Sequence, residues 1–152
     1  MKDSFYQLGL LGKNFTFTSR LMQSAFDETV EYCRTRQQFG KPIGEFQIMQ
    51  AKIADMYTKL QSTRAYLYSL AQLADQGQVS NADCASIFTL SAENGVDVAM
   101  EAIQALGGNG YINEYPVGRI MRDAKLYTIG GGTNEIRRWL SGRELMKNYQ
   151  QP

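Results

Sequence analysis

The sequence contains no histidine, and this absence excludes several kinds of catalytic and metal-binding site. Ser-His and Cys-His nucleophile pairs use an imidazole as general base, and many metal sites use it as a ligand. The two cysteines, Cys33 and Cys84, lie far apart and form no CxxC motif. We therefore expect reduced thiols, a cytoplasmic or mitochondrial-matrix location, and no metal site.

Long apolar runs are also missing. No uncharged stretch approaches the roughly 18 residues that a membrane span needs. Residues 1–7 have Asp3 beside their only lysine and no continuous apolar core, so no signal peptide is expected. A net charge of +1 gives no reason to expect nucleic acid or an anionic membrane as partner. With 43% hydrophobic and 20% charged residues, the 152-residue chain fits one soluble globular domain.

What the sequence does contain is helical periodicity. An apolar seam in alternating three- and four-residue steps predicts a long helix packed in a bundle, which Gly77 ends. Ser80 and Asp83 resemble a capping box that opens a second helix over residues 82–106, whose alanines permit close helix approach. The seam consists of Phe46, Met49, Ile53, Met56, Leu60, Thr63, Leu67, Leu70 and Ala74.

Further helices are predicted over residues 19–36, 119–127 and 133–147, with a loop over 107–116. No segment shows sustained two-residue alternation between hairpin turns, so no strand is predicted. We therefore expect an all-α chain that forms an antiparallel four-helix bundle with an extra short helix. Tyr111, Tyr115 and Tyr127 could line a ligand cavity, but we expect each of them to pack in the core.

The glycine triplet Gly130–Gly131–Gly132 leads into the last predicted helix. Glycine lets the backbone approach a ligand closely and adopt a positive φ. Thr133 is a suitable N-cap, and Glu135 complements the helix dipole. The unpaired N–H groups of such a helix start can hold an anion, a phosphate or a ligand carbonyl. A loop-to-helix junction without a ligand is the alternative.

Four segments together are more specific than any one of them. They are residues 36–43 with Phe46 and Gln47, residues 105–111, residues 122–125 and residues 132–136. In this order and spacing they closely resemble the C-terminal helical domain of the acyl-CoA dehydrogenases, and most of all the isovaleryl-CoA and other short- and branched-chain members. We expect residues 21–147 to form this domain, preceded by a non-matching segment, 1–20, and followed by a tail, 148–152.

The resemblance implies a flavoprotein oxidoreductase that uses FAD to remove two hydrogens from the α and β carbons of an acyl-CoA thioester, in fatty-acid or branched-chain amino-acid catabolism. Arg36 would reach the pyrophosphate of a neighbouring subunit's FAD. The implied cofactor contacts are Arg36, Phe39, Gln47, Gln104, Ala105, Leu106, Gly107 and Gly108 on the neighbour's FAD, and Thr133, Asn134 and Glu135 on the chain's own. Gly131 and Gly132 would lie at the substrate.

Each of these residues also has a structural interpretation. Arg36 could be a solvated helix-end arginine that complements the dipole. Phe39 could fill space beneath its loop, and Gln47 could be an exposed helix residue. Gly107 and Gly108 could form an ordinary helix C-cap. We read the pair Arg122 and Asp123 as structural, fixing the short helix against its neighbours.

The catalytic base expected of this family is missing. Dehydrogenation needs a carboxylate that abstracts the α-proton near the flavin. Many members carry it just before a Gly-Thr pair, where this chain has Gly131. Others carry it on an earlier helix, at a position that falls on Leu10, followed by Leu11. The nearest acids, Asp27 and Glu28, lie more than four helical turns further on, so no catalytic residue is expected.

The chain is also shorter than the three-domain enzyme that the resemblance implies. We therefore expect a FAD-contacting and oligomer-forming domain that is inactive alone, binds FAD weakly or not at all, and meets acyl-CoA only in the complete enzyme. A homo-dimer or tetramer is the expected assembly. Two alternatives stay open: a helical assembly module without cofactor, and a subunit completed by a partner chain. A truncated gene product and an isolated domain both fit this length.

Overall fold

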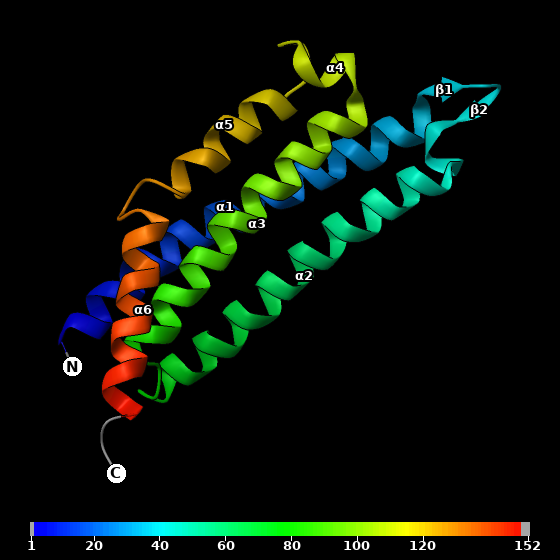
Figure 1. Ribbon diagram of the computed structural model, residues 1–152. Helices are drawn as coiled ribbons and strands as arrows, with labels where there is room; N and C mark the ends of the chain where they lie inside the picture. Colours follow the sequence, from blue (N-terminus) through cyan, green and yellow to red (C-terminus); the bar gives the residue numbers. More distant parts are fainter. Residues whose placement is uncertain (1, 150–152) are drawn as a thin grey trace.

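The computed structural model describes the backbone of residues 2–149 and the side chains of residues 17–147 and 149. Three long helices, α1 (Lys2–Thr35), α2 (Gln47–Asp75) and α3 (Asn81–Leu106), lie side by side (Figure 1). Helix α2 is antiparallel to both α1 and α3, which run in the same direction (Figure 1). The remaining elements are short: β1 (Gln37–Gln38), β2 (Lys41–Pro42), a 3₁₀ turn (Ile43–Glu45), α4 (Gly108–Tyr111), α5 (Val117–Tyr127) and α6 (Asn134–Tyr149).

The fourth member of the bundle is made of two helices. Helices α5 and α6 follow one another along α3, in the direction opposite to α3 (Figure 1). Helix α3 contacts α1, α2, α5 and α6 and is therefore the centre of the domain. The expected all-α antiparallel bundle is confirmed, but its fourth member is divided into α5 and α6 by the glycine segment. Among the described residues, no helix is long and apolar enough to cross a membrane.

The predicted end of α2 and start of α3 are both confirmed. Gly77 has a φ of +70°, and its N–H donates to the carbonyl of Ala74, while the N–H of Gln78 donates to the carbonyl of Leu73. This pair of hydrogen bonds is a Schellman cap. Ser80 then caps α3, because its hydroxyl accepts from the N–H of Asp83 at 3.0 Å.

Small residues on α3 let its neighbours approach closely. Ala92, Ala99 and Ala102 are fully or almost fully buried, and a Cβ on Gly95 would touch Ala124 of α5. Larger apolar side chains from α1, α2 and α5 fill the space around this strip. The main core consists of Met22, Ala25, Met56, Leu60, Val98, Ala99, Ala102, Leu106, Val117, Ile120 and Ala124.

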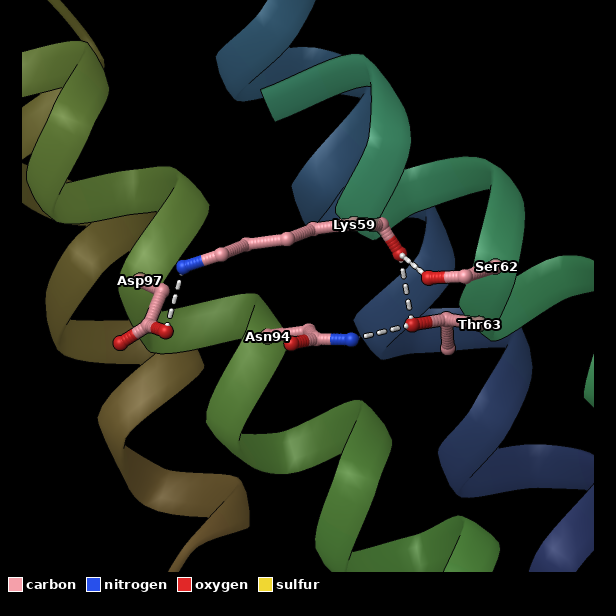
Figure 2. Close-up of polar contacts among 5 residues, drawn as sticks. All are labelled: Lys59, Ser62, Thr63, Asn94 and Asp97. Atoms are coloured by element: carbon pink, nitrogen blue, oxygen red, sulfur yellow. Dashed lines mark hydrogen bonds and ion pairs between the residues drawn. The ribbon is translucent and has the colours of Figure 1, made fainter. Parts of the chain in front are cut away.

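A polar seam joins α2 to α3 beside this core (Figure 2). The Asn94 amide of α3 donates to the Thr63 hydroxyl of α2 at 2.8 Å. Asp97, about one turn further along α3, forms an ion pair with Lys59 of α2 at 2.6 Å. Thr63 also donates to the carbonyl of Lys59. Because both partners of the ion pair are partly exposed, its contribution to stability is at most about 1 kcal/mol. These contacts therefore contribute more to the alignment of α2 with α3 than to the free energy of unfolding.

Three predictions about local structure were wrong. The loop expected over residues 107–116 contains the short helix α4. Helix α1 begins at Lys2 rather than near residue 19, because extending an existing helix is far easier than nucleating one and propensity is only a weak guide. The side chains of Leu10 and Leu11 lie outside the described residues. A small hairpin also occurs where no strand was expected: Gln37 pairs with Pro42 and Gln38 with Lys41.

Candidate functional site

A pocket of about 380 Å³ lies where the C-terminal ends of α1 and α3 meet. We call it the Arg36 pocket. The sequence separates its two walls by about 70 residues, and they come together because α1 and α3 pack against each other in the same direction (Figure 1). Its lining comprises Tyr32, Arg36, Gln38, Ile43, Ala105, Leu106, Gly107, Gly108 and Asn109. Thus five of the eight residues expected to contact a neighbouring cofactor line one pocket.

Backbone geometry at the end of α3 shapes the floor of this pocket. Gly107 has a φ of +62°, and its N–H donates to the carbonyls of Ile103 and Gln104. The cap interpretation of Gly107 is therefore correct, and it is compatible with ligand contact. Asn109 links the two walls, because its amide donates to the hydroxyl of Tyr32 at 2.9 Å.

The chemistry of the pocket suits an anionic group. Arg36 is exposed and forms no ion pair with any described residue. Its guanidinium therefore presents its donors to an incoming anion, in the planar arrangement that matches phosphate oxygens. Exposed glycine backbone at Gly107 and Gly108 lies opposite, and a Cβ at either glycine would meet nothing within 4 Å. This combination of donors fits a dinucleotide pyrophosphate.

The other three residues expected to contact a neighbour's FAD, Phe39, Gln47 and Gln104, do not line the Arg36 pocket. Gln47, at the start of α2, and Gln104, on α3, are exposed and do not line it. Phe39 occupies the two-residue hairpin turn with Gly40, where both residues have a positive φ, of +52° and +80°. Its side chain is 92% exposed, so the interpretation of Phe39 as a filler beneath the loop is wrong.

The residues expected to contact the chain's own FAD lie at a different place on the bundle. A pocket of about 410 Å³, the glycine-loop pocket, is bounded by α3, the end of α5 and the start of α6. It contains Thr133, Asn134 and Glu135 together with Glu93, Val96, Asp97, Lys125, Thr128, Ile129 and Arg138. Gly131 and Gly132 form the loop beside it, with φ values of +68° and +97° that favour glycine.

Thr133 caps α6 as predicted. Its hydroxyl accepts from the N–H of Ile136 at 3.4 Å. The pKa of Glu135 is lowered, first by a hydrogen bond from its own backbone N–H and then by one from the Thr133 hydroxyl. Glu135 is therefore ionised at neutral pH, which complements the positive end of the helix dipole.

The pocket holds carboxylates that sequence reasoning did not consider. Glu93 forms an ion pair with Arg138 and also accepts from the Asn134 amide at 3.4 Å. Asp97 forms its ion pair with Lys59 of α2. In the sequence, only a four-residue spacing on one helix face connects Glu93 with Asp97, and the exposed face of any helix can show this spacing. Asp27 and Glu28, the nearest acids considered before, line neither of the two pockets.

Sequence reasoning also missed Arg137 and misplaced three residues. Arg137 is buried beneath the glycine loop, although charged residues are rarely buried without a carboxylate partner. Tyr111 is 89% exposed rather than in the core, because it ends the short helix α4 at the surface. The side chains of Arg122 and Asp123 are exposed and make no hydrogen bond or ion pair within the described part of the chain, so they do not fix α5 against its neighbours in that way.

The fold places the chain in the class of antiparallel, all-α domains, and the arrangement of its loops can now be compared with known proteins. The family description "Acyl-CoA dehydrogenase, C-terminal domain" matches residues 14–146. The chain therefore belongs to the acyl-CoA dehydrogenase family.

Relatives agree with this assignment. The chain is 59% identical over 127 residues to the mitochondrial isovaleryl-CoA dehydrogenase of Oryza sativa subsp. japonica, covering 84% of this chain and 31% of that protein. The solved structure of butyryl-CoA dehydrogenase from Megasphaera elsdenii superimposes with a TM-score of 0.85 at 34% identity, covering 92% of this chain and 37% of that one. A FAD complex of PigA gives a TM-score of 0.78 at 35% identity, covering 84% and 33%.

Proposed function

We propose that this chain is the FAD-contacting and oligomer-forming domain of an acyl-CoA dehydrogenase, acting on a short or branched acyl-CoA. The chain spans about a third of the length of the curated relatives it matches, so the activity belongs to a larger protein. The observation that carries the proposal is the Arg36 pocket, where a guanidinium that pairs with no described carboxylate shares one pocket with the glycine end of α3.

Two separate pockets suggest contact with two different FAD molecules. The Arg36 pocket is lined by the ends of α1 and α3 next to the hairpin, whereas the glycine-loop pocket is lined by α3, α5 and the start of α6. Figure 1 shows the hairpin and α6 at opposite ends of the bundle. One chain would then touch its own flavin through Thr133, Asn134 and Glu135 and a neighbour's through the Arg36 pocket. Gly131 and Gly132 would lie at the acyl-CoA. FAD, when bound, would be the electron acceptor, and the residues of this chain would bind and orient it.

Self-association follows from the same arrangement, because a pocket that serves a neighbour's cofactor needs that neighbour. Helix α6 and helix α2 also expose large apolar side chains: Ile48, Tyr57, Tyr68, Ile136, Trp139 and Met146. Surfaces of this kind are usually covered by partners. A homo-dimer or a dimer of dimers is the proposed assembly. The buried free thiols Cys33 and Cys84 fit a reducing compartment such as the mitochondrial matrix or the cytoplasm.

We propose that none of the described residues serves as the base for α-proton abstraction. Gly131 has no side chain to offer, and the pocket carboxylates Glu93 and Asp97 are each held by a cation. An ion-paired carboxylate is a weaker base, because the cation favours its charged form. We therefore propose that the chain alone does not oxidise acyl-CoA.

The experiment that tests the cofactor proposal is a FAD titration of the purified chain, followed by flavin fluorescence. Arg36→Gln should weaken FAD binding by about tenfold or more, because a charge-assisted hydrogen bond contributes roughly 1.5–3 kcal/mol. Arg34→Gln is the matched control, since it removes the same charge from the same helix end outside the Arg36 pocket. Equal effects of the two variants would contradict the pocket. Detectable FAD binding by the wild-type chain would contradict the cofactor-free assembly module.

Catalysis is tested by reduction of an electron-acceptor dye with isovaleryl-CoA and added FAD. We expect no turnover by the wild-type chain. Gly131→Glu should not restore it, because a positioned base contributes its roughly 10²–10⁴-fold only when substrate and flavin are already held. Residue 131 also has a φ of +68°, which strains a glutamate. Clear wild-type turnover would show that a carboxylate such as Asp27 or Glu28 acts as the base. Turnover only with an added partner chain would support a completed subunit.

A further inference from the structure

Helix α6 buries its polar side and exposes its apolar side. Asn134, Arg137 and Ser141 are its buried residues, at one-turn intervals, whereas Ile136 and Trp139 are more than half exposed. An ordinary surface helix has the opposite distribution. The buried polar face therefore has a function other than adding apolar surface to the core.

Arg137 is the least expected member of this face. Its side chain is buried, with 4% of the residue exposed, and it forms no ion pair with a described carboxylate. The Cζ atom of its guanidinium lies over the ring of Phe88, 3.1 Å from the ring centroid. Burial lowers the pKa of Arg137 to about 10, so the side chain remains charged at neutral pH. Burying such a cation is costly unless its donors are used.

The donors of Arg137 are directed at the backbone around the glycine loop. Nη1 donates to the carbonyl of Tyr127 at 3.1 Å, and Nη2 donates to the carbonyl of Gly130 at 2.6 Å. Tyr127 is the last residue of α5, where carbonyls lack helical partners and a positive charge is favoured by the helix dipole. One side chain of α6 thus ties down the end of α5 and the first glycine of the loop.

A second contact connects this clamp to the glycine-loop pocket. Nη1 of Arg137 also donates to the Asn134 side-chain oxygen at 3.2 Å, and the Asn134 amide donates to Glu93 of α3. Glu93 and Asn134 both line the pocket. The network therefore joins α3, α5 and α6 behind the loop without occupying the pocket itself.

From this geometry we propose that Arg137 is a positioning residue, which holds the glycine loop and Asn134 in the conformation that receives a flavin. The inference rests on the proposed function, because it assumes that this pocket contacts FAD. Binding that must order a loop loses affinity to the entropy of ordering, so a loop held in place beforehand binds more tightly. No residue other than arginine reaches two carbonyls and an amide at once with a planar set of five donors.

The test compares three variants of the full chain. Arg137→Met keeps a long apolar side chain against Phe88 but removes every donor. Arg137→Lys retains one cationic donor group and should rescue part of the effect. Ser141→Ala is the matched control one turn further along α6: it removes the hydrogen bond to the Ala82 carbonyl but touches neither the glycine loop nor Asn134.

Two measurements are made on each variant, alongside its thermal midpoint. The first is hydrogen exchange of the N–H groups of Gly130 and Asn134, which bond to the carbonyls of Leu126 and Thr128. The second is FAD affinity. We expect Arg137→Met to accelerate exchange at both amides and to weaken FAD binding by about tenfold or more, with Arg137→Lys between it and the wild type. Ser141→Ala should lower the thermal midpoint while leaving both readouts unchanged.

The proposal is overturned if Arg137→Met leaves exchange at Gly130 and Asn134 unchanged. It is also overturned if Ser141→Ala and Arg137→Met lower FAD affinity in the same proportion as stability, since Arg137 would then be merely structural. If Arg36→Gln and Arg34→Gln weaken FAD binding equally, the proposed function fails instead. If the wild-type chain alone binds no FAD, which is also expected of a domain that meets FAD only in a larger protein, the affinity comparison gives no readout. The exchange measurement then still decides whether Arg137 holds the loop.

Discussion

Replacing Gly110 with alanine should disturb the end of α3 and the Arg36 pocket together. Gly110 is buried in α4, and a Cβ on it would lie 2.4 Å from the carbonyl oxygen of Ile103 and 2.9 Å from the Ile103 Cα. The conflict involves backbone atoms on both sides, so no side-chain rotation relieves it. The short helix α4 would have to move away from α3.

The size of the effect follows from this overlap. Overpacking a filled site typically costs about 1–3 kcal/mol, and we expect the upper part of that range because backbone must shift. For a domain of this size, 1 kcal/mol lowers the thermal midpoint by about 2–4 °C. Movement of α4 would also displace Asn109, whose amide bonds to Tyr32 across the pocket.

The assay is thermal and urea unfolding followed by circular dichroism, with Gly108→Ala as the matched control. Gly108 belongs to the same four-residue helix, but a Cβ there would meet nothing within 4 Å. Gly108→Ala should be neutral or stabilise the chain by up to about 1 kcal/mol, because alanine reduces the freedom of the unfolded state. Equal stability of the two variants, within about 0.5 kcal/mol, would refute the argument from close approach.

Three further outcomes can be measured on the wild-type chain or a single variant. Burial raises the pKa of the Cys33 and Cys84 thiols, so neither should react with a thiol reagent at pH 8 until urea unfolds the chain; rapid reaction of the native protein would contradict their burial. The same shifts favour the folded state below pH 9.0, the usual thiol pKa, and this stability is lost as the pH rises through the raised values. The free energy of unfolding should therefore fall from pH 9 upward, opposed above about pH 10 by the lowered pKa of Arg137; a rise between pH 9 and 10 would be inconsistent with this. Ser80→Ala should cost about 1 kcal/mol, because the N–H of Asp83 loses its acceptor, and no change in the urea midpoint would show that the cap contributes nothing.

The helices and their ends could be predicted from the sequence alone, because these depend on neighbours in the chain. The seam from Phe46 to Ala74 carries the core residues Met56 and Leu60, and the caps at Gly77 and Ser80 use residues only a few positions away. The absence of histidine and the glycine at position 131 likewise limit the chemistry without any structure.

Other features depend on residues that only folding brings together. The pairing of Arg36 with Gly107 and Gly108 requires α1 and α3 to end at the same place. The hairpin is too short for a two-residue period to appear, and its turn carries Phe39 rather than a typical turn residue. From the sequence, Arg137 of α6 would be expected to be exposed to solvent, because it is charged. Its burial is decided by the carbonyls of Tyr127 and Gly130 and the ring of Phe88, because the free energy of a buried charge depends on the partners that the tertiary structure supplies.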